Sequence, residues 1–315
     1  MNKTIKSIMY SSVLGYYITR TVIAFWHFFS YKLYLTDRQA IKLQFKKAHG
    51  YKLNLKSPKT LNEKMQWLKI HDRTPLHTLY ADKYAVRKVF EERYGQERLV
   101  DLVFQTTSWK DITIENMPDY PFIIKPNHGS GWYHIIEDKN KVDWNQIRTD
   151  CRFWLSQNAY FMQKEWQYKN ISPCIIVEQL LIRKDGRIPT NFRVHCFHGK
   201  VGLIALTIYL SNDTEDYRNQ KYSRDWELLK IDWANKDVDL SKIRSFEPLN
   251  RPETLDEMIQ IAEDISKDFK YVRVDFFDVD GKLYHGEITF HDGGGYERIT
   301  PFEWDVKLGE MIKLH

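Results

Sequence analysis

Two apolar segments near the C-terminal end of the sequence carry charged residues that could act together. The first predicts a strand with Arg273 and Asp275 on one face, and Glu287 lies in the second segment. These charges could form an ordinary ion-pair cluster at the surface. Both segments are apolar enough on their other faces to lie deep in a fold, however, and buried acids need a cation. Mg²⁺, which prefers oxygen ligands, is the natural candidate.

A hairpin that joins the two segments would decide whether the acids can share a metal ion. In an antiparallel hairpin directly paired residues share a face, so the loop length determines which residues meet. A two-residue loop at Asp280-Gly281 would put Asp275 and Glu287 on opposite faces. A three-residue loop, 279–281, would pair Asp275 with His285 and make the two acids diagonal neighbours. We therefore expect an odd-length loop and one shared surface for Arg273, Asp275, Glu287 and Thr289.

Two further segments could contact a nucleotide. Lys125 ends a short predicted strand and precedes a glycine-bearing loop made of His128, Gly129, Ser130 and Gly131. An ammonium group can meet phosphate oxygens, and loop N–H groups can cover them. The same lysine could instead be solvated and the loop an ordinary turn. Glu178 lies within the apolar strand predicted for 175–181, where it either pairs with a nearby cation or accepts from the adenine amine.

The elements around these residues mix helices with hairpins. A helical region is predicted at 58–101, in which Leu61, Met65 and Leu68 recur at helical spacing. A further helix is predicted at 144–157. Thr254 and Glu257 have the spacing of a capping box and open a further helix. Strands are predicted at 122–125, 132–137, 175–181, 271–278 and 282–290, and two more flank His198-Gly199. This order favours an α+β fold with antiparallel sheets over a doubly wound parallel sheet.

Composition and charge restrict the class of protein. The three cysteines lack any CxxC spacing, which indicates a reduced, cytoplasmic chain without a zinc site. Residues 1–73 hold 14 Lys/Arg and three acids, a local net charge of +11. No nucleic-acid-binding motif accompanies this basic block, so no nucleic-acid partner is expected. An apolar stretch, 8–35, precedes most of it, which favours either an anionic membrane surface bound through residues 1–60 or packing of the stretch on the protein's own core.

The series of motifs, taken in order, resembles the TupA-like family of ATP-grasp enzymes. The resemblance spans about residues 57–311 and is carried by TLNEKMQWL (60–68), ADKYAVR (81–87), FIIKPNHGSG (122–131), IVEQ (176–179), FRVHCFHGK (192–200), VRVD (272–275) and GEITF (286–290). It implies an ATP-grasp fold in which two α+β lobes close on ATP. It also implies a division into an N-terminal helical segment, 1–56, and a catalytic region, 57–315, with a nucleotide-covering lobe at about 120–180 and a metal-site lobe at about 181–315.

The resemblance also implies roles for particular residues. Lys83 and Lys125 resemble the lysines that hold ATP phosphates, and the loop 128–131 resembles the one that covers them. The hinge strand that reads adenine corresponds to Glu178, Gln179, Leu180 and Leu181. Asp275, Glu287 and Thr289 would hold Mg²⁺, while Arg273 and Arg193 would stabilise the transferred phosphoryl group. Arg193 stands where many relatives have lysine, and Thr289 stands where many ATP-grasp enzymes have asparagine.

The activity that the resemblance implies is an ATP- and Mg²⁺-dependent ligation of a carboxylate to an amine, through an acyl phosphate and with release of ADP. The family points to teichuronic or capsular polysaccharide biosynthesis, with a uronic acid of a sugar or glycan as the carboxylate substrate. Its location would be cytoplasmic, at or near the inner face of the plasma membrane. The alternative is a metal-dependent glycosyltransferase, for which the only Asp-x-Asp tripeptides are 237–239, in a polar loop, and 278–280, at a hairpin turn.

Overall fold

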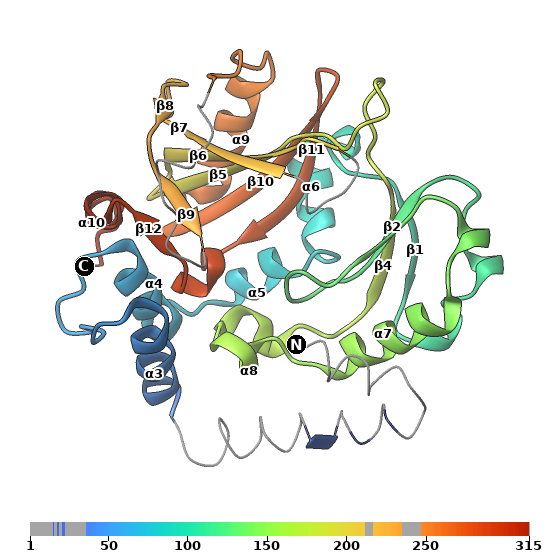
Figure 1. The fold of residues 1–315 in the computed structure, drawn as a ribbon, viewed down its shortest axis with the longest axis horizontal. Helices are drawn as coiled ribbons and strands as arrows, with labels where there is room; N and C mark the ends of the chain where they lie inside the picture. Colours follow the sequence, from blue (N-terminus) through green and yellow to red (C-terminus); the bar gives the residue numbers. More distant parts are fainter. Residues whose placement is uncertain are drawn as a thin grey trace. The chain divides into compact units, whose positions relative to one another are not determined.

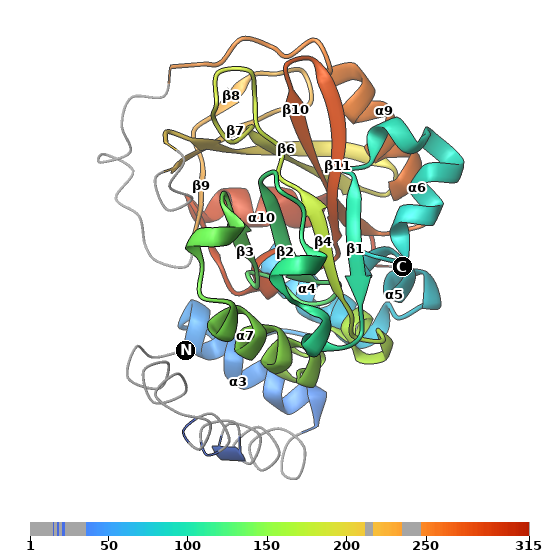
Figure 2. The same cartoon turned by 90° about the vertical axis from the view of Figure 1, so that its right-hand side faces the viewer.

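The computed structural model describes residues 36–211, 217–234 and 247–314, together with Gly15, Ile18, Thr21 and Val22. Most of the apolar stretch 8–35 and the tripeptide 237–239 lie outside these residues. The chain divides into two compact units, Met1–Leu43 with Leu102–Gln179 and Gln44–Asp101 with Leu180–His315. Most helices and strands of both are labelled in Figure 1, and β3 is labelled in Figure 2. Within the described ranges, no helix is both long and apolar enough to cross a membrane.

The first unit is built on a four-stranded antiparallel sheet. Within its described residues the strand order is β1-β4-β2-β3, with β1 at Leu102–Thr106, β2 at Phe122–Pro126, β3 at His134–Ile136 and β4 at Ile175–Gln179. Phe122 and Ile124 alternate toward the core. They meet α7 (Trp144–Ser156), which begins at the N-cap Asp143 and lies along this sheet in Figure 2. A further helix of this unit is α8 (Tyr160–Gln163), and short 3₁₀ turns lie at Trp109–Asp111, Ile114–Asn116, Lys139–Lys141 and Trp166–Asn170.

The second unit is built on a larger antiparallel sheet of order β11-β10-β5-β6-β7-β8. Its strands are β5 (Asn191–Phe197), β6 (Lys200–Tyr209), β7 (Tyr217–Tyr222), β8 (Leu228–Leu229), β10 (Tyr271–Val279) and β11 (Lys282–Thr289). One face is covered by α9 (Leu255–Ser266), which packs on β5, β6 and β10. The helix buries Leu255, Met258, Ala262 and Ile265 at helical spacing, as its sequence predicts.

The capping box predicted for α9 is wrong. Thr254 has helical backbone angles and makes no side-chain cap. Its hydroxyl instead donates to Asp278 Oδ2 at 2.5 Å, and Glu257 pairs with Arg98. A capping box does occur at the start of α4 (Leu61–His71), where Thr60 and Glu63 cap each other's backbone.

The opposite face of the larger sheet is apolar at one end only. There Tyr271, Phe197 and Leu203 pack with α4 and with α10 (Phe302–Glu310). A two-stranded sheet of β9 (Asp232–Ala234) and β12 (Arg298–Thr300) adds Trp233 and Ile299 to this core. Further elements among the described residues are α5 (Pro75–Ala81), α6 (Val86–Tyr94) and two 3₁₀ turns, Gln96–Arg98 and Asp292–Gly295. Helix α3 (Asp37–His49) runs from the first unit into the second. The predicted α+β fold with antiparallel sheets is therefore confirmed.

Candidate active site

Arg273 is the centre of a buried charge cluster in the second unit. Its guanidinium donates to both oxygens of Asp275, at 2.6 and 2.7 Å, and to Glu287 Oε1 at 2.8 Å. It also donates to Asp292, a residue that the sequence analysis did not single out. The Arg273 side chain is only 9% exposed, so these bonds are shielded from water. The cluster joins β10, β11 and the turn that follows β11.

The hairpin that carries these residues has a different register from the predicted one. Val279 pairs with Lys282, so the loop contains only Asp280 and Gly281, and the predicted odd-length loop is wrong. Both loop residues have positive φ, 54° and 86°, which is the conformation of the primed turns that match the twist of paired strands. The predicted pairing of Asp275 with His285 is wrong as well, because His285 pairs with Phe276.

A β-bulge nevertheless brings the two acids to one face. Between Val274 and Phe276 the register shifts, so that β11 contributes one residue more than β10. One extra residue reverses which face the remainder of the strand presents. Arg273 therefore reaches both Asp275 and Glu287, and Thr289 Oγ1 lies 3.3 Å from Glu287 Oε1. The expected common surface for these residues exists, although by a route that the sequence analysis did not predict.

Lys83 joins the same cluster from a distant part of the sequence. It lies in the turn between α5 and α6, and its Nζ is 3.3 Å from Glu287 Oε2. The carboxylate of Glu287 is thus held between a guanidinium and an ammonium group. A phosphate group that approached this surface would meet two fixed cations of the kind that bind phosphate oxygens.

Two of the three acids that accept from Arg273, Asp275 and Asp292, have pKa values shifted in opposite directions. Burial raises the pKa of Asp275 to about 6; Arg273 opposes this shift and Glu287 adds to it. Burial would also raise the pKa of Asp292, but the charge of Arg273 outweighs it and lowers the pKa to about 2. At Asp275 the effect of burial therefore outweighs the opposing charges of Arg273 and Arg193.

Asp275, Glu287 and Thr289 fit a magnesium ion. Over the described ranges no group of three or more His, Cys, Asp and Glu residues could hold a metal. Mg²⁺ does not need such a group, because it is usually held by one or two carboxylates and completes its shell with water and phosphate oxygens. Two carboxylates and a hydroxyl are all oxygen donors.

Helix α4 holds the glycine turn next to Asp292. Gln66 Nε2 donates to the carbonyls of Gly294 and Gly295 at 3.0 and 2.9 Å, and Lys69 Nζ donates to Gly294 O at 2.5 Å. Gln66 and Lys69 are both fully buried. The three glycines of the turn all have positive φ, which few other residues adopt. The motif TLNEKMQWL thus has a structural role that its sequence alone did not reveal.

In the first unit, Lys125 and Glu178 form an ion pair. Lys125 Nζ lies 2.6 Å from Glu178 Oε2, and Lys125 and Glu178 lie on the paired strands β2 and β4. The pairing is the simpler of the two interpretations given for Glu178. The strand β4 ends at Gln179, so Leu180 and Leu181 follow it outside the sheet. The pair also places a lysine beside the strand expected to read adenine.

The loop after β2 is anchored by Asn127, which exchanges hydrogen bonds with Cys174 and donates to Ser172 O at 3.0 Å. His128 is buried, whereas Ser130 is exposed. Gly129 and Gly131 have φ of 76° and 72°. A side chain at Gly129 would come within 3.0 Å of the Trp132 ring. The loop therefore needs glycine for both its backbone and its packing.

One of the two Asp-x-Asp tripeptides that would support a glycosyltransferase, 278–280, has a structural role. Asp278 accepts from Thr254 and from the backbone N–H of Gly281, and Asp280 accepts from Lys184 N. These bonds fix the turn. The other tripeptide, 237–239, lies outside the described residues.

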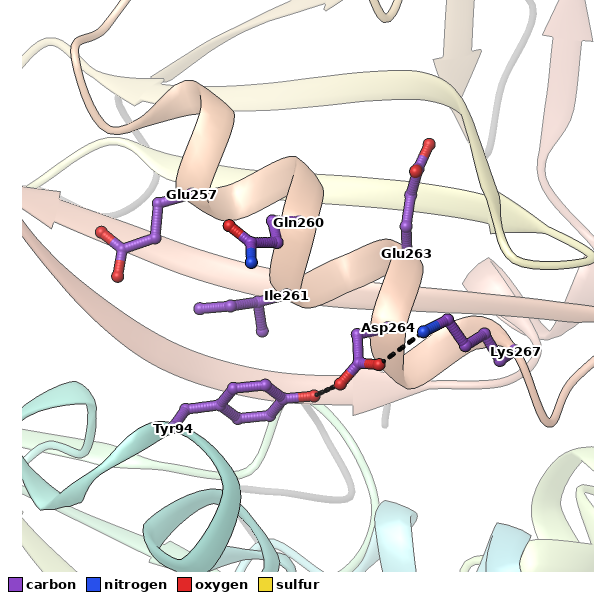
Figure 3. Close-up of a pocket in the computed structure, with 7 residues that line it drawn as sticks. All are labelled: Tyr94, Glu257, Gln260, Ile261, Glu263, Asp264 and Lys267. Atoms are coloured by element: carbon purple, nitrogen blue, oxygen red, sulfur yellow. Dashed lines mark hydrogen bonds and ion pairs between the residues drawn. The ribbon is translucent and has the colours of Figure 1, made fainter.

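A pocket on α9 and Tyr94, shown in Figure 3, has a volume of about 420 Å³. Its acids Glu257, Glu263 and Asp264 already pair with Arg98, Lys200 and Arg93. The helix α9 covers the sheet face opposite to Arg273. The pocket is therefore separate from the charge cluster.

Comparisons with known proteins identify the family. The profile of the family described as TupA-like ATPgrasp matches residues 63–313. The solved structures that resemble the chain include D-alanine–D-alanine ligase from Bacillus anthracis, at 17% identity, 67% of this chain, 57% of that chain and a TM-score of 0.38. They also include the same enzyme from Helicobacter pylori, at 15%, 80%, 69% and 0.41, and the ATP-grasp ligase PsnB with its minimal precursor, at 12%, 69%, 54% and 0.38.

The chain spans little more than half the length of the first of these structures, 57%. No curated protein matches the sequence. The family profile, in contrast, covers most of the chain and includes every residue of the charge cluster, from Lys83 to Asp292. The chain belongs to the TupA-like ATP-grasp family.

Proposed function

We propose that the protein is an ATP-dependent carboxylate–amine ligase. The observation that carries this proposal is the cluster in which Arg273 holds Asp275 and Glu287 on one face, with Lys83 and Thr289 beside Glu287. Such a set of fixed charges suits phosphoryl transfer, in which catalysis consists mainly of positioning and charge neutralisation. The described residues that the cluster uses include no nucleophilic serine or cysteine, and the proposed reaction needs none.

The reaction has two steps. A carboxylate oxygen of the acceptor attacks the γ-phosphorus of ATP, the bond to the β–γ bridging oxygen breaks, and ADP leaves. An amine then attacks the carbonyl carbon of the acyl phosphate; phosphate leaves with the bonding pair, the amine loses a proton, and an amide forms. Lys83 and Arg273 offset the negative charge of the phosphoryl group. Asp275, Glu287 and Thr289 would hold Mg²⁺, which lowers the repulsion between the two anions.

The nucleotide would be bound by Lys125, by the loop of His128, Gly129, Ser130 and Gly131, and by the strand end of Glu178, Gln179, Leu180 and Leu181. We assign residues of about 120–180 to the nucleotide-covering lobe and 181–315 to the metal-site lobe. The substrates we propose are a uronic acid of a bacterial surface polysaccharide precursor and an amino compound. The location we propose is the cytoplasm, with residues 1–60 on the inner face of the plasma membrane. The family assignment does not itself specify these substrates or this location, which belong to the proposal.

The proposal is tested with purified protein, ATP, Mg²⁺ and a panel of uronic acids and amines. We expect ADP release that requires both an acid and an amine. The product should be heavier than the acid by the mass of the amine less one water. Hydroxylamine as the amine would trap the acyl phosphate as a hydroxamate. Release of AMP, or turnover of a sugar nucleotide without ATP, would show that the reaction belongs to another class.

A further inference from the structure

The sheet face that carries Asp275 continues as a polar surface over β5, β6 and β7. Arg193 pairs directly with Asp275, Ala205 pairs with Arg193, and Lys221 pairs with Ala205. Neighbouring strands are about 4.8 Å apart, so Arg193 and Lys221 are about 10 Å apart at the backbone. Alanine contributes only a methyl group between the two long side chains. The row therefore places two cations on either side of a small residue.

This surface presents unused hydrogen-bond donors. Arg193 Nη2 donates to Asn219 Oδ1 at 3.3 Å, and Thr207 donates to the same oxygen at 3.1 Å. The amide nitrogen of Asn219 makes no hydrogen bond within the described part of the chain. Arg193 Nε is buried and likewise has no partner there. A buried donor such as Arg193 Nε costs free energy unless a ligand satisfies it, whereas Asn219 is only partly buried.

The positive charge of the row is only partly offset by the protein. Lys221 is 2% exposed, and its Nζ lies 3.5 Å from Asp232 Oδ1, which is a long ion pair. Burial lowers the pKa of Lys221, and Asp232 opposes that shift. Glu297 also acts on Lys221, and burial raises the pKa of Glu297 to about 7. An anion would supply the charge that these acids do not.

One acceptor completes the surface. Asn191 lies on the same face of β5 as Arg193, two residues before it, and its Oδ1 is buried without a partner among the described residues. Asn191 pairs with Thr207, which pairs with Asn219, so the four polar side chains are neighbours on adjacent strands. A ligand that satisfies this set needs an anionic group for the donors and a hydroxyl or amine for Asn191.

We propose that Arg193, Asn219 and Lys221 bind the carboxylate of a hydroxylated acid, with Asn191 accepting a hydrogen bond from one of its hydroxyls. This inference rests on the proposed function, because it assigns the place of the acceptor substrate. Arg193 is the member next to Asp275, so a carboxylate bound there lies beside the residues proposed to hold Mg²⁺. The acceptor's class is thus a hydroxy acid such as a uronic acid.

The experiment measures binding without turnover. Glucuronate, glucose and ADP with Mg²⁺ are titrated separately into the wild-type protein, Lys221→Gln and the matched control Lys230→Gln, whose lysine is exposed. We expect glucuronate to bind the wild type and the control, and about tenfold more weakly to K221Q, as loss of one charged hydrogen bond predicts. Glucose should bind none of them measurably, and ADP should bind all three equally.

Three results would overturn the inference. Equal weakening of ADP binding in K221Q would assign the row to nucleotide phosphates, and equal glucuronate binding in all three proteins would leave Lys221 without a role. Failure of the wild type to bind glucuronate would exclude uronic acids as the ligand of this row. If circular dichroism shows that K221Q is unfolded, Asn219→Ala, which is partly exposed, replaces it. A chain that binds glucuronate but releases no ADP would contradict the ligase proposal and leave the binding site intact.

Discussion

At the scale of single residues, Arg273 bonds to three carboxylates whose roles differ. Asp292 accepts from Arg273 beside the glycine turn, and its pKa is lowered. Asp275 is buried, and its pKa is raised. We expect Asp275→Asn to bind ADP nearly as well as the wild type and to lose at least about 100-fold in kcat, because its charge would act mainly in the transition state. Steady-state kinetics with calorimetry would measure both. Asp101→Asn, at an exposed position, is the control.

Lys125 and Glu178 need a different design, because each neutralises the other. Lys125→Ala alone should weaken ATP binding, but it also leaves the 6% exposed carboxylate of Glu178 without its 2.6 Å partner. The double variant Lys125→Met/Glu178→Gln removes the ammonium group of Lys125 and the carboxylate charge of Glu178 together. We expect both variants to lose nucleotide affinity and only the single variant to lose stability. Unchanged ADP affinity in the double variant would exclude Lys125 as a phosphate ligand.

Glu297 should make stability depend on pH. Burial raises its folded-state pKa to about 7, from an ordinary value of 4.5, and the neighbouring Asp292 adds to the shift. The folded state therefore holds this proton more tightly than the unfolded state. The resulting stability is fully present below pH 4.5 and is lost as pH rises through 7.

Replacing Glu297 with Gln keeps the shape and removes the titration. Urea unfolding of wild type and Glu297→Gln between pH 4.5 and 8 should show the variant gaining on the wild type as pH rises. The gain should not exceed about 1.4 kcal/mol per unit of pKa shift. A difference between the two proteins that does not change with pH would mean that Glu297 titrates normally in the folded state.

At the scale of elements, the hairpin shows what sequence can and cannot predict. The alternation of residues correctly predicted that Arg273 and Asp275 share a face, and the apolar segments correctly predicted both strands. The loop was predicted from the need to bring Asp275 and Glu287 together, which assumed uninterrupted pairing. The structure meets that need with a bulge opposite Asp275. A bulge depends on cross-strand contacts, so one strand's sequence does not specify it. Gly286 was its only local sign.

The links from α4 to the glycine turn were also beyond sequence reasoning. Gln66 and Lys69 lie over 220 residues from Gly294, and their partners are backbone carbonyls, which leave no mark in a sequence. Buried Lys69 looked like one more cation of the basic N-terminal block. The glycines themselves were visible, but their purpose was not. Long-range contacts with main-chain atoms need the fold before they can be recognised.

A matched pair of glycine variants tests the role of this turn. Gly295→Ala and Gly281→Ala both place alanine at positive φ, 66° and 86°, so their backbone strain is similar. At Gly295 the new methyl would lie 2.4 Å from Gln66 Nε2 and 2.9 Å from Met65 Cβ, whereas nothing lies within 4 Å at Gly281. We expect G295A to lose about 1–3 kcal/mol more than G281A, as overpacking does. Equal losses by urea unfolding would show that the turn yields easily.

At the scale of the whole chain, the order of motifs predicted more than any one motif. Each short segment had an ordinary structural explanation. For Glu178 that explanation was pairing with a nearby cation, and the structure shows such a pair with Lys125. The α+β fold followed from hairpins and helices in mixed order, and the family profile agrees with the series over residues 63–313. Asp275, Glu287 and Arg273 converge because their spacing follows from strand pairing, whereas Lys83 reaches Glu287 from the turn between α5 and α6. In the polar row on β5 to β7, Arg193 was predicted as a site residue, but Asn191, Asn219 and Lys221 were missed because each is unremarkable singly.

The last prediction concerns residues 1–35, nearly all of which lie outside the described residues. Every proposed site residue follows Tyr80, and Asp37, the first residue of α3, already accepts from Tyr160 at 2.6 Å. We therefore expect a chain that starts at Thr36 to fold and to keep the turnover of the full chain on a water-soluble acid. The deletion removes the apolar stretch and four Lys/Arg, each worth about 1 kcal/mol near an anionic surface. Sedimentation with phosphatidylserine vesicles should fall, while neutral phosphatidylcholine vesicles and raised salt serve as controls. A truncated chain that folds but sediments as before would place the membrane contact elsewhere, and one that fails to fold would assign residues 1–35 to the core.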